Sequence, residues 1–217
     1  MAMFDKIILC AISNQLTAGL WRLGKLQSHQ VFQNNEQGLA DFSLFLTNHS
    51  NTKLYFLADA VEEDYRLGTL PHTSGGARRE VVERKLSQLY RGITYRAAHF
   101  INREQDKRKD DRFLFVALNS SDSIQSWISI IEEQQAPLVG VYLLPMVSQS
   151  LVRRMKLMAP HILLCERLSS GLRQSYLHNG RLRISRLTPV PPVAQSQLGH
   201  FYVSETEKTR LYLISQR

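Results

Sequence analysis

Cysteine is scarce: Cys10 and Cys165 are the only two cysteines in 217 residues. Both lie inside apolar runs, so we expect two buried, inert thiols rather than a disulfide. The seven histidines are scattered, and no His or Cys pairs occur at the spacing of metal ligands. We therefore predict no structural zinc and no other resident metal.

Long apolar runs are also absent. No run approaches the ~20 residues that a membrane-spanning helix needs. The N-terminal segment MAMFDKIILCAIS lacks the basic region and cleavage site of an export signal, and we interpret it as a first strand. Hydrophobic residues make up 43% of the chain, which is typical of globular proteins. We expect a soluble, cytoplasmic protein.

Acidic residues are rare in one part of the chain. Residues 150–190 carry eight Lys and Arg side chains against the single carboxylate of Glu166. This local excess of positive charge favours an acidic partner. The candidates are an anionic lipid surface, a nucleic acid and an acidic protein face. The predicted partner-facing or lipid-facing basic surface consists of Arg153, Arg154, Arg173, Arg181, Arg183 and Arg186.

Nucleic acid is the least favoured of these partners. Aromatic residues are not interleaved with the arginines as they are on base-stacking surfaces. On a strand, Arg181 and Arg183 share one face while Leu182 and Ile184 share the other. We therefore expect an amphipathic strand with a solvated basic face.

The sequence repeats one pattern. Residues 7–32 (IILCAISNQLTAGLWRLGKLQSHQVF) and 162–187 (ILLCERLSSGLRQSYLHNGRLRISRL) each contain an apolar run ending in Cys, a Ser-containing turn and a second turn with Gly. Each copy predicts three meandering strands followed by a helix. We expect two similar lobes that face each other.

The predicted fold class is mixed α/β. The first lobe covers residues 1–145 and contains a strand-helix-strand insertion at about 61–112. A bridging helix follows at 146–160, and the incomplete second lobe occupies 161–217. Because its sheet does not close, we expect the full protein to continue. The remaining predicted elements are strands at 53–60, 65–72, 94–102, 112–119 and 137–145, and helices at 35–49, 73–92, 121–135, 146–158 and 204–217.

This arrangement resembles the duplicated ribonuclease-H-like fold of the actin-like ATPases. Within that superfamily it is most similar to the cytoplasmic PilM and GspL-type components of type IV pilus and type II secretion systems. Their strand, acidic turn and "LP" segment resemble LYFLADAVEEDYRLGTLPH of this sequence. The helix that follows in those proteins is similar to ARREVVERKLSQLY. APLVGVYLLPMVSQSLVRRM is similar to the strand and helix that lead into their second lobe.

The resemblance implies two phosphate-binding turns. The first turn of an actin-like ATPase normally supplies an Asp for the magnesium-bound water and a Gly that opens backbone amides to phosphate. Here no Asp or Glu lies between Asp5 and Glu36, and no Gly precedes Gly19. Five residues of the two turns could still offer hydroxyl or amide contacts to phosphate if a nucleotide binds: Ser13, Asn14, Thr17, Ser169 and Ser170. We favour the interpretation that they are ordinary polar turn residues.

Other clusters favour structural roles. The acidic stretch from Asp59 to Asp64 lacks the first-strand carboxylate of a two-metal nuclease, so we interpret it as a solvated turn. The mixed-sign loop REQDKRKDD at 103–111 is interpreted as a solvated hairpin tip. Trp21, Trp127, Met155 and Met158 are expected in the core.

These observations favour a non-catalytic scaffold without catalytic residues or a resident cofactor. Its expected partners are other assembly-machine proteins, among them a motor ATPase, and an anionic membrane surface. We expect it in the cytoplasm, tethered to the inner membrane by a segment outside this sequence. The alternative is a nucleotide-binding ATPase with atypical phosphate turns, in which ATP and Mg²⁺ bind and Glu166 replaces the missing carboxylate.

Overall fold

The computed structural model describes residues 5–12, 14–105, 108–119, 122–192 and 195–215. The chain divides into two compact units, Met1–Ser148 and Gln149–Arg217. The boundary falls inside helix α4 (Leu144–Arg154). None of the helices in the described ranges has the length and hydrophobicity that crossing a membrane requires.

The first unit contains a five-stranded mixed sheet in the order β3-β2-β1-β4-β8. Strand β1 alternates, and its buried residues Ile7, Leu9 and Ala11 point to one face. It pairs antiparallel with β2 and parallel with β4, as the predicted meander and returning strand require. The strands are β1 (Asp5–Ile12), β2 (Gln15–Arg22), β3 (Lys25–Gln33), β4 (Lys53–Ala58) and β8 (Leu138–Leu143).

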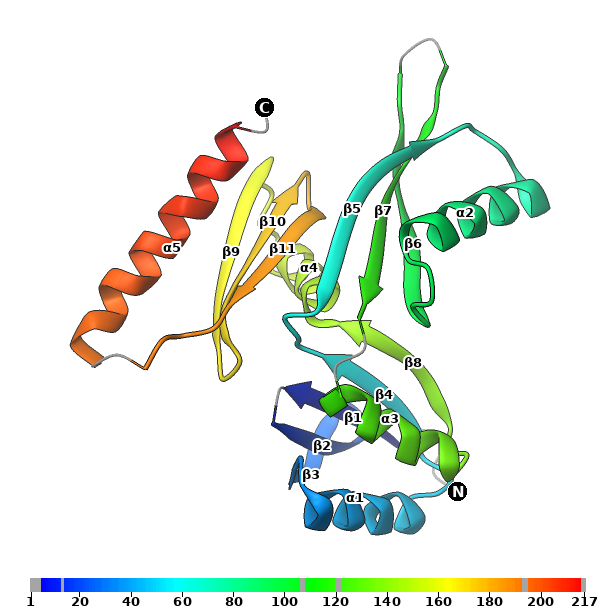
Figure 1. The fold of residues 1–217 in the computed structure, drawn as a ribbon, viewed down its shortest axis with the longest axis vertical. Coiled ribbons are helices and arrows are strands. Elements are labelled where there is room, and N and C mark those ends of the chain that lie inside the picture. Colours follow the sequence, from blue (N-terminus) through cyan, green and yellow to red (C-terminus); the bar gives the residue numbers. More distant parts are fainter. Residues whose placement is uncertain (1–4, 13, 106–107, 120–121, 193–194, 216–217) are drawn as a thin grey trace. The chain divides into compact units, whose positions relative to one another are not determined.

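Helices α1 (Glu36–Asn48) and α3 (Asp122–Glu133) lie side by side against this sheet (Figure 1). The ring of Phe42 packs edge-on against Phe32 and against Trp127, with centroids 5.4 Å apart in both pairs. Trp127 is fully buried, which confirms its predicted place in the core, whereas Trp21 is half-buried. The sequence predicts Ser120, Ser121 or Asp122 as the cap of α3; the helix begins at Asp122, and positions 120 and 121 lie outside the described residues.

A separate antiparallel sheet occupies the predicted insertion. It has the order β5-β7-β6, formed by Glu63–Leu70, Asp111–Leu118 and Tyr95–Arg103, and carries helix α2 (Gly75–Leu89). The sheet has three strands rather than two, because β7 pairs with both β5 and β6 and extends beyond the expected end of the insertion at residue 112. An apolar run such as FLFVAL suits a central strand of any sheet, so its pattern does not identify its neighbours.

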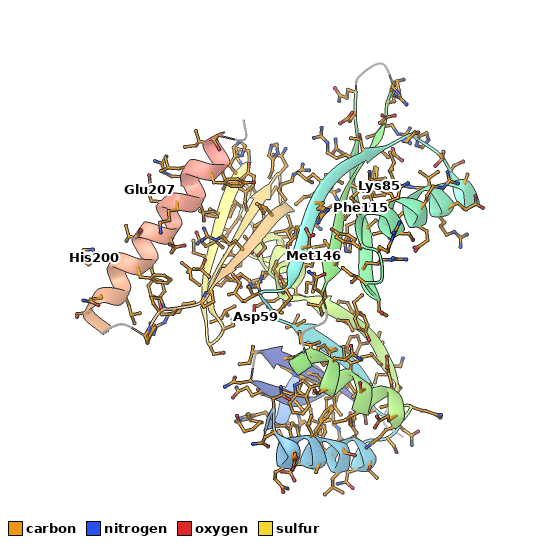
Figure 2. The ribbon with its side chains drawn as sticks, in the orientation of Figure 1. Asp59, Lys85, Phe115, Met146, His200 and Glu207 are labelled. Atoms are coloured by element: carbon orange, nitrogen blue, oxygen red, sulfur yellow. The ribbon has the colours of Figure 1, made fainter. Side chains whose placement is uncertain are left out.

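Helix α2 covers one face of the three-stranded sheet (Figure 1). Leu86 packs against Phe113 and Phe115, and the ring of Phe115 lies between β7 and α2 (Figure 2). Tyr90, directly after the helix, donates a hydrogen bond of 3.1 Å from its hydroxyl to the Phe115 carbonyl. Burial raises the pKa of Tyr90 to about 12, so the phenol keeps its proton and this bond even near pH 10, where an ordinary tyrosine ionises.

The base of the β6–β7 hairpin contains a buried charge. Asp111 is 1% exposed, and its carboxylate accepts hydrogen bonds from His72 Nδ1 and Arg103 Nε, each over 3.1 Å. Arg78 adds a cation 3.7 Å away and lies over the ring of Phe100. The interpretation of the whole 103–111 loop as a solvated tip is therefore wrong for Asp111, which joins the hairpin to the start of α2.

The second unit contains an antiparallel sheet in the order β11-β10-β9 with α5 (Gln195–Ser215) along one side (Figure 1). Its strands are β9 (His161–Leu168), β10 (Gly171–His178) and β11 (Arg181–Thr188). Helix α5 begins at Gln195 rather than at the expected residue 204, so the segment SETE, whose Ser and acidic residues are typical of a helix start, lies inside the helix. Helix α4 ends at Arg154 rather than at 158.

The two copies of the repeat have the same backbone plan. In the first copy, the β2–β3 turn places Leu23 and Gly24 at φ 50° and 77°; in the second, the β10–β11 turn places Asn179 and Gly180 at φ 51° and 66°. Both hairpins also carry a register shift at the corresponding rung, between Leu20 and Trp21 in one and between Tyr176 and Leu177 in the other. The prediction that residues 162–187 repeat the strand pattern of 7–32 is confirmed.

The side chains of the two copies differ where a helix covers the sheet. With the turns superimposed, Leu9 and Ala18 of the first core correspond to Cys165 and Gln174. Cys165 is exposed and its Sγ lies 3.8 Å from Thr206 Oγ1, so the prediction of a buried thiol is wrong there. Cys10 is half-buried, and burial raises the pKa of its thiol, which fits an inert residue.

Helix α5 is attached to the second sheet largely through polar groups. Arg186 donates to the buried carboxylate of Glu205 over 3.0 Å, and the guanidinium of Arg167 lies 5.8 Å from the ring centre of Tyr202. The amide of Gln174 is buried beneath the helix and has no hydrogen-bond partner among the residues that the structure describes. The contact between α5 and its sheet is therefore more polar than the apolar contact between α1 and the sheet of the first unit, and it contributes less hydrophobic stabilisation.

Candidate functional site

The first predicted phosphate turn lies beyond the pair of Ile12 and Gln15, the last pair that β1 forms with β2. Ser13 lies outside the described residues. Asn14 is exposed, and its carbonyl accepts a bond of 2.9 Å from the Asn34 amide. Thr17 lies within β2, so it does not belong to the turn.

The second predicted turn is short. Ser169 is exposed, Ser170 is half-buried, and Leu168 pairs with Gly171 directly across the turn. Gly171 has φ +144°, and a Cβ on it would lie 2.4 Å from the Thr188 carbonyl oxygen. Neighbouring backbone therefore occupies the space beside Gly171. Glu166 lies within β9, paired with Arg173.

Asp59 places a buried acidic residue next to the first turn. Asp59 follows β4, and its amide donates 3.0 Å to the carbonyl of Ala11 near the end of β1 (Figure 2). The sequence signal for this position was available, because parallel β1 and β4 place their carboxyl ends at one edge of the sheet. Asp59 is 5% exposed, so the interpretation of it as solvated is wrong.

The rest of the acidic stretch is occupied by local hydrogen bonds. Glu63 accepts one bond from the Ala60 amide at 3.2 Å and another from the Tyr65 hydroxyl at 2.7 Å. Asp64 accepts from Arg66 at 2.7 Å. Across the described ranges, no group of three or more His, Cys, Asp or Glu side chains is placed to hold a metal ion.

A groove in the first unit lies between its two sheets. It has a volume of about 310 Å³. Strands β6 and β8 are both outermost strands of their sheets, β6 beside β7 and β8 beside β4. The walls are formed by segments of β6, β7 and β8, and by Thr94 just before β6: Thr94–Ala97, Val116–Leu118, Leu138, Gly140, Val141 and Leu143.

The predicted basic surface is only partly exposed. Arg153, Arg154 and Arg181 are exposed, but Arg173 is 1% exposed and donates to Ser185 Oγ at 3.2 Å. The assignment of Arg173 to this surface is therefore wrong. Arg186 is exposed, but its guanidinium is paired with the carboxylate of Glu205. Arg183 does not share the exposed face of Arg181, as an alternating strand would require; it is half-buried because it occupies the β-bulge of the β10–β11 hairpin.

No protein-family model and no curated protein matches this sequence. Solved structures do match it. A Bacteroides thetaiotaomicron protein with an actin-like ATPase fold aligns with a TM-score of 0.54 and 9% identity over 96% of this chain and 77% of that one. The chain has the actin-like ATPase fold.

Two further proteins of similar structure belong to assembly machines. The cytoplasmic domain of EpsL, an inner membrane component of the type II secretion system of Vibrio cholerae, aligns with a TM-score of 0.52 and 8% identity over 85% of this chain and 71% of that one. The PilM-PilN type IV pilus biogenesis complex aligns with a TM-score of 0.58 and 8% identity, covering 85% of this chain and 61% of that one. The predicted actin-like fold, with PilM-type and GspL-type proteins among its structural relatives, is confirmed.

Proposed function

We propose that this protein is a non-catalytic scaffold of an inner-membrane pilus or secretion-type assembly machine. It would work in the cytoplasm by binding other components, including a motor ATPase. The observation that carries the proposal is the groove between β6 and β8, on an actin-like fold whose first turn has no carboxylate in its sequence. The likeness to EpsL and PilM-PilN supports this choice of machine.

Strand β8 has the properties of a strand that accepts a partner. Its sequence, LVGVYL, contains no charge and no proline, the residues that commonly protect an outer strand from pairing. Val139 and Tyr142 are 48% and 40% exposed. An unprotected apolar edge in a soluble fold favours a partner that supplies the missing strand.

The groove fits an extended apolar segment. Main-chain groups of such a segment would pair with the outer edge of β8, while its side chains would contact the half-buried residues Ala97, Leu138 and Val141 in the groove. We therefore propose that the partner contributes a short apolar stretch of another assembly protein. The PilM-PilN complex supports this, because it shows a protein of this fold holding a second assembly protein.

Site-specific photocrosslinking in cells tests the proposal. A photoreactive phenylalanine at position 139, on β8, should crosslink to one assembly protein, and the same residue at position 44, on α1, should not. Leu44 is 62% exposed and is a matched control for surface apolarity. The Val141→Lys substitution should abolish the crosslink without changing thermal unfolding. Equal crosslinking from both positions would contradict the proposal.

A further inference from the structure

The segment SLVRRMKLM at residues 150–158 leaves large apolar side chains exposed. Leu151 is 51% exposed, Met155 60% and Met158 86%, and Leu157 is 44% exposed. Met155 and Met158 were expected in the core, and that prediction is wrong. We call residues 151–158 the basic apolar turn.

The backbone of the basic apolar turn is ordered by hydrogen bonds. The amide of Lys156 donates 3.0 Å to the Arg153 carbonyl, and the amide of Leu157 donates 3.3 Å to the Val152 carbonyl. Lys156 has φ 56°, so the chain ends α4 with the left-handed residue of a Schellman motif. The exposed methionines therefore project from a fixed turn.

Cations alternate with these apolar side chains. Arg153, Arg154 and Lys156 are all exposed, and no Asp or Glu occurs from residue 134 to residue 165. Arg153 donates through Nε to the Gly180 carbonyl at 3.3 Å, so its bond to a neutral oxygen leaves the positive charge uncompensated there. The turn thus combines apolar tips with an unbalanced positive charge.

We propose that the basic apolar turn contacts a membrane surface that contains anionic phospholipid. Leu151, Met155 and Met158 would enter the headgroup region, and the adjacent cations would contact lipid phosphates. A stable protein interface uses about 20–30 residues a side, far more than this turn supplies, whereas lipid binding needs only a few apolar tips and cations. This inference does not depend on the β6–β8 groove.

Vesicle sedimentation of the intact chain tests the proposal. The probes are vesicles of phosphatidylcholine alone and of phosphatidylcholine mixed with phosphatidylglycerol. Binding should require phosphatidylglycerol, and it should fall when the salt rises from ~0.1 M to ~1 M, since the Debye length then shrinks from ~10 to ~3 Å. Arg154→Gln and Lys156→Gly should each reduce partitioning about fivefold.

Lys156→Gly is the variant that cannot fail through misfolding, because glycine favours the conformation at this position. The double variant Met158→Ser/Arg154→Gln should lose most of the binding. Its matched control, Leu44→Ser/Arg84→Gln, removes one exposed apolar residue and one exposed cation from the first unit and should bind as the unchanged chain does. Equal losses in both double variants, binding independent of phosphatidylglycerol, or no binding at all would overturn the proposal.

Discussion

The carboxylate of Asp111 accepts a hydrogen bond from His72 Nδ1 over 3.1 Å at the base of the β6–β7 hairpin. Its other oxygen accepts a hydrogen bond from Arg103 Nε. Burial acts to raise the pKa of Asp111, but the hydrogen bonds and charges of His72 and Arg103 outweigh it and lower the pKa. A carboxyl whose pKa is lowered on folding stabilises the folded state above its unfolded pKa of about 3.9. That contribution disappears as the pH falls through the lowered value.

We expect Asp111→Asn to lower the free energy of unfolding by about 2 kcal/mol at pH 7, since the variant loses charged hydrogen bonds. The difference from the unchanged protein should shrink below about pH 4. Urea unfolding at several pH values measures both effects. Asp41→Asn, at an exposed position on α1, is the control and should change little. A constant difference between Asp111→Asn and the unchanged protein at every pH would contradict the assigned ion pair.

Gly38 should resist substitution. A Cβ at this position would lie 1.9 Å from the carbonyl oxygen of Gln33, because the end of β3 passes directly beside the first turn of α1. Gly38→Ala is expected to destabilise the first unit by more than about 2 kcal/mol. Gly76→Ala, at a helical position with open space, should instead stabilise by about 0.5–1 kcal/mol. Thermal unfolding of the two variants should move in opposite directions.

Two glutamines of the second unit should respond oppositely to the same substitution. Gln174→Met removes a buried amide that finds no partner within the described part of the chain, so we expect a gain of about 1–2 kcal/mol. Gln149→Met removes the acceptor of the Leu182 amide, a bond of 2.6 Å, and should cost about 1 kcal/mol. Hydrogen exchange of β10 and β11 amides would measure both. A loss of stability in Gln174→Met would show that the amide is satisfied in solution.

Mg-ATP should give only heats of dilution in calorimetry with this protein. The first turn has no carboxylate in its sequence, and backbone crowds the space beside Gly171. Binding that the Glu166→Ala variant abolishes would restore the nucleotide-dependent alternative. Ser170→Ala is a suitable control, because it changes the same hairpin without removing a charge.

Much of the architecture could be predicted because it depends on local signals. Asn179-Gly180 predicts a tight hairpin from the conformations that these residues adopt, and the structure has both at positive φ. The equivalent turn at Leu23-Gly24 is less obvious, since leucine rarely adopts φ 50°. It is predicted from the segment LGKL, whose glycine supplies one of the two left-handed positions.

Other features depend on tertiary contacts that no short segment reveals. The run FLFVAL predicts a buried strand, and the loop at 103–111 predicts its hairpin with β6, but neither shows that β7 also pairs with β5. The exposure of Met158 and the burial of Arg173 reverse the usual preferences of these residue types. In the candidate site, the short turns followed from the sequence, but the position of Asp59 required the register of β1 with β4.

The shared irregularity of the two hairpins has a consequence for their design. Gln27 and Arg183 are the extra residues of the two bulges, and they lie at the same distance from their turns although one is neutral and the other charged. The position of the bulge therefore follows from the backbone of the hairpin rather than from the identity of the extra residue. Either side chain can be exchanged while the twist that the bulge gives the hairpin is kept.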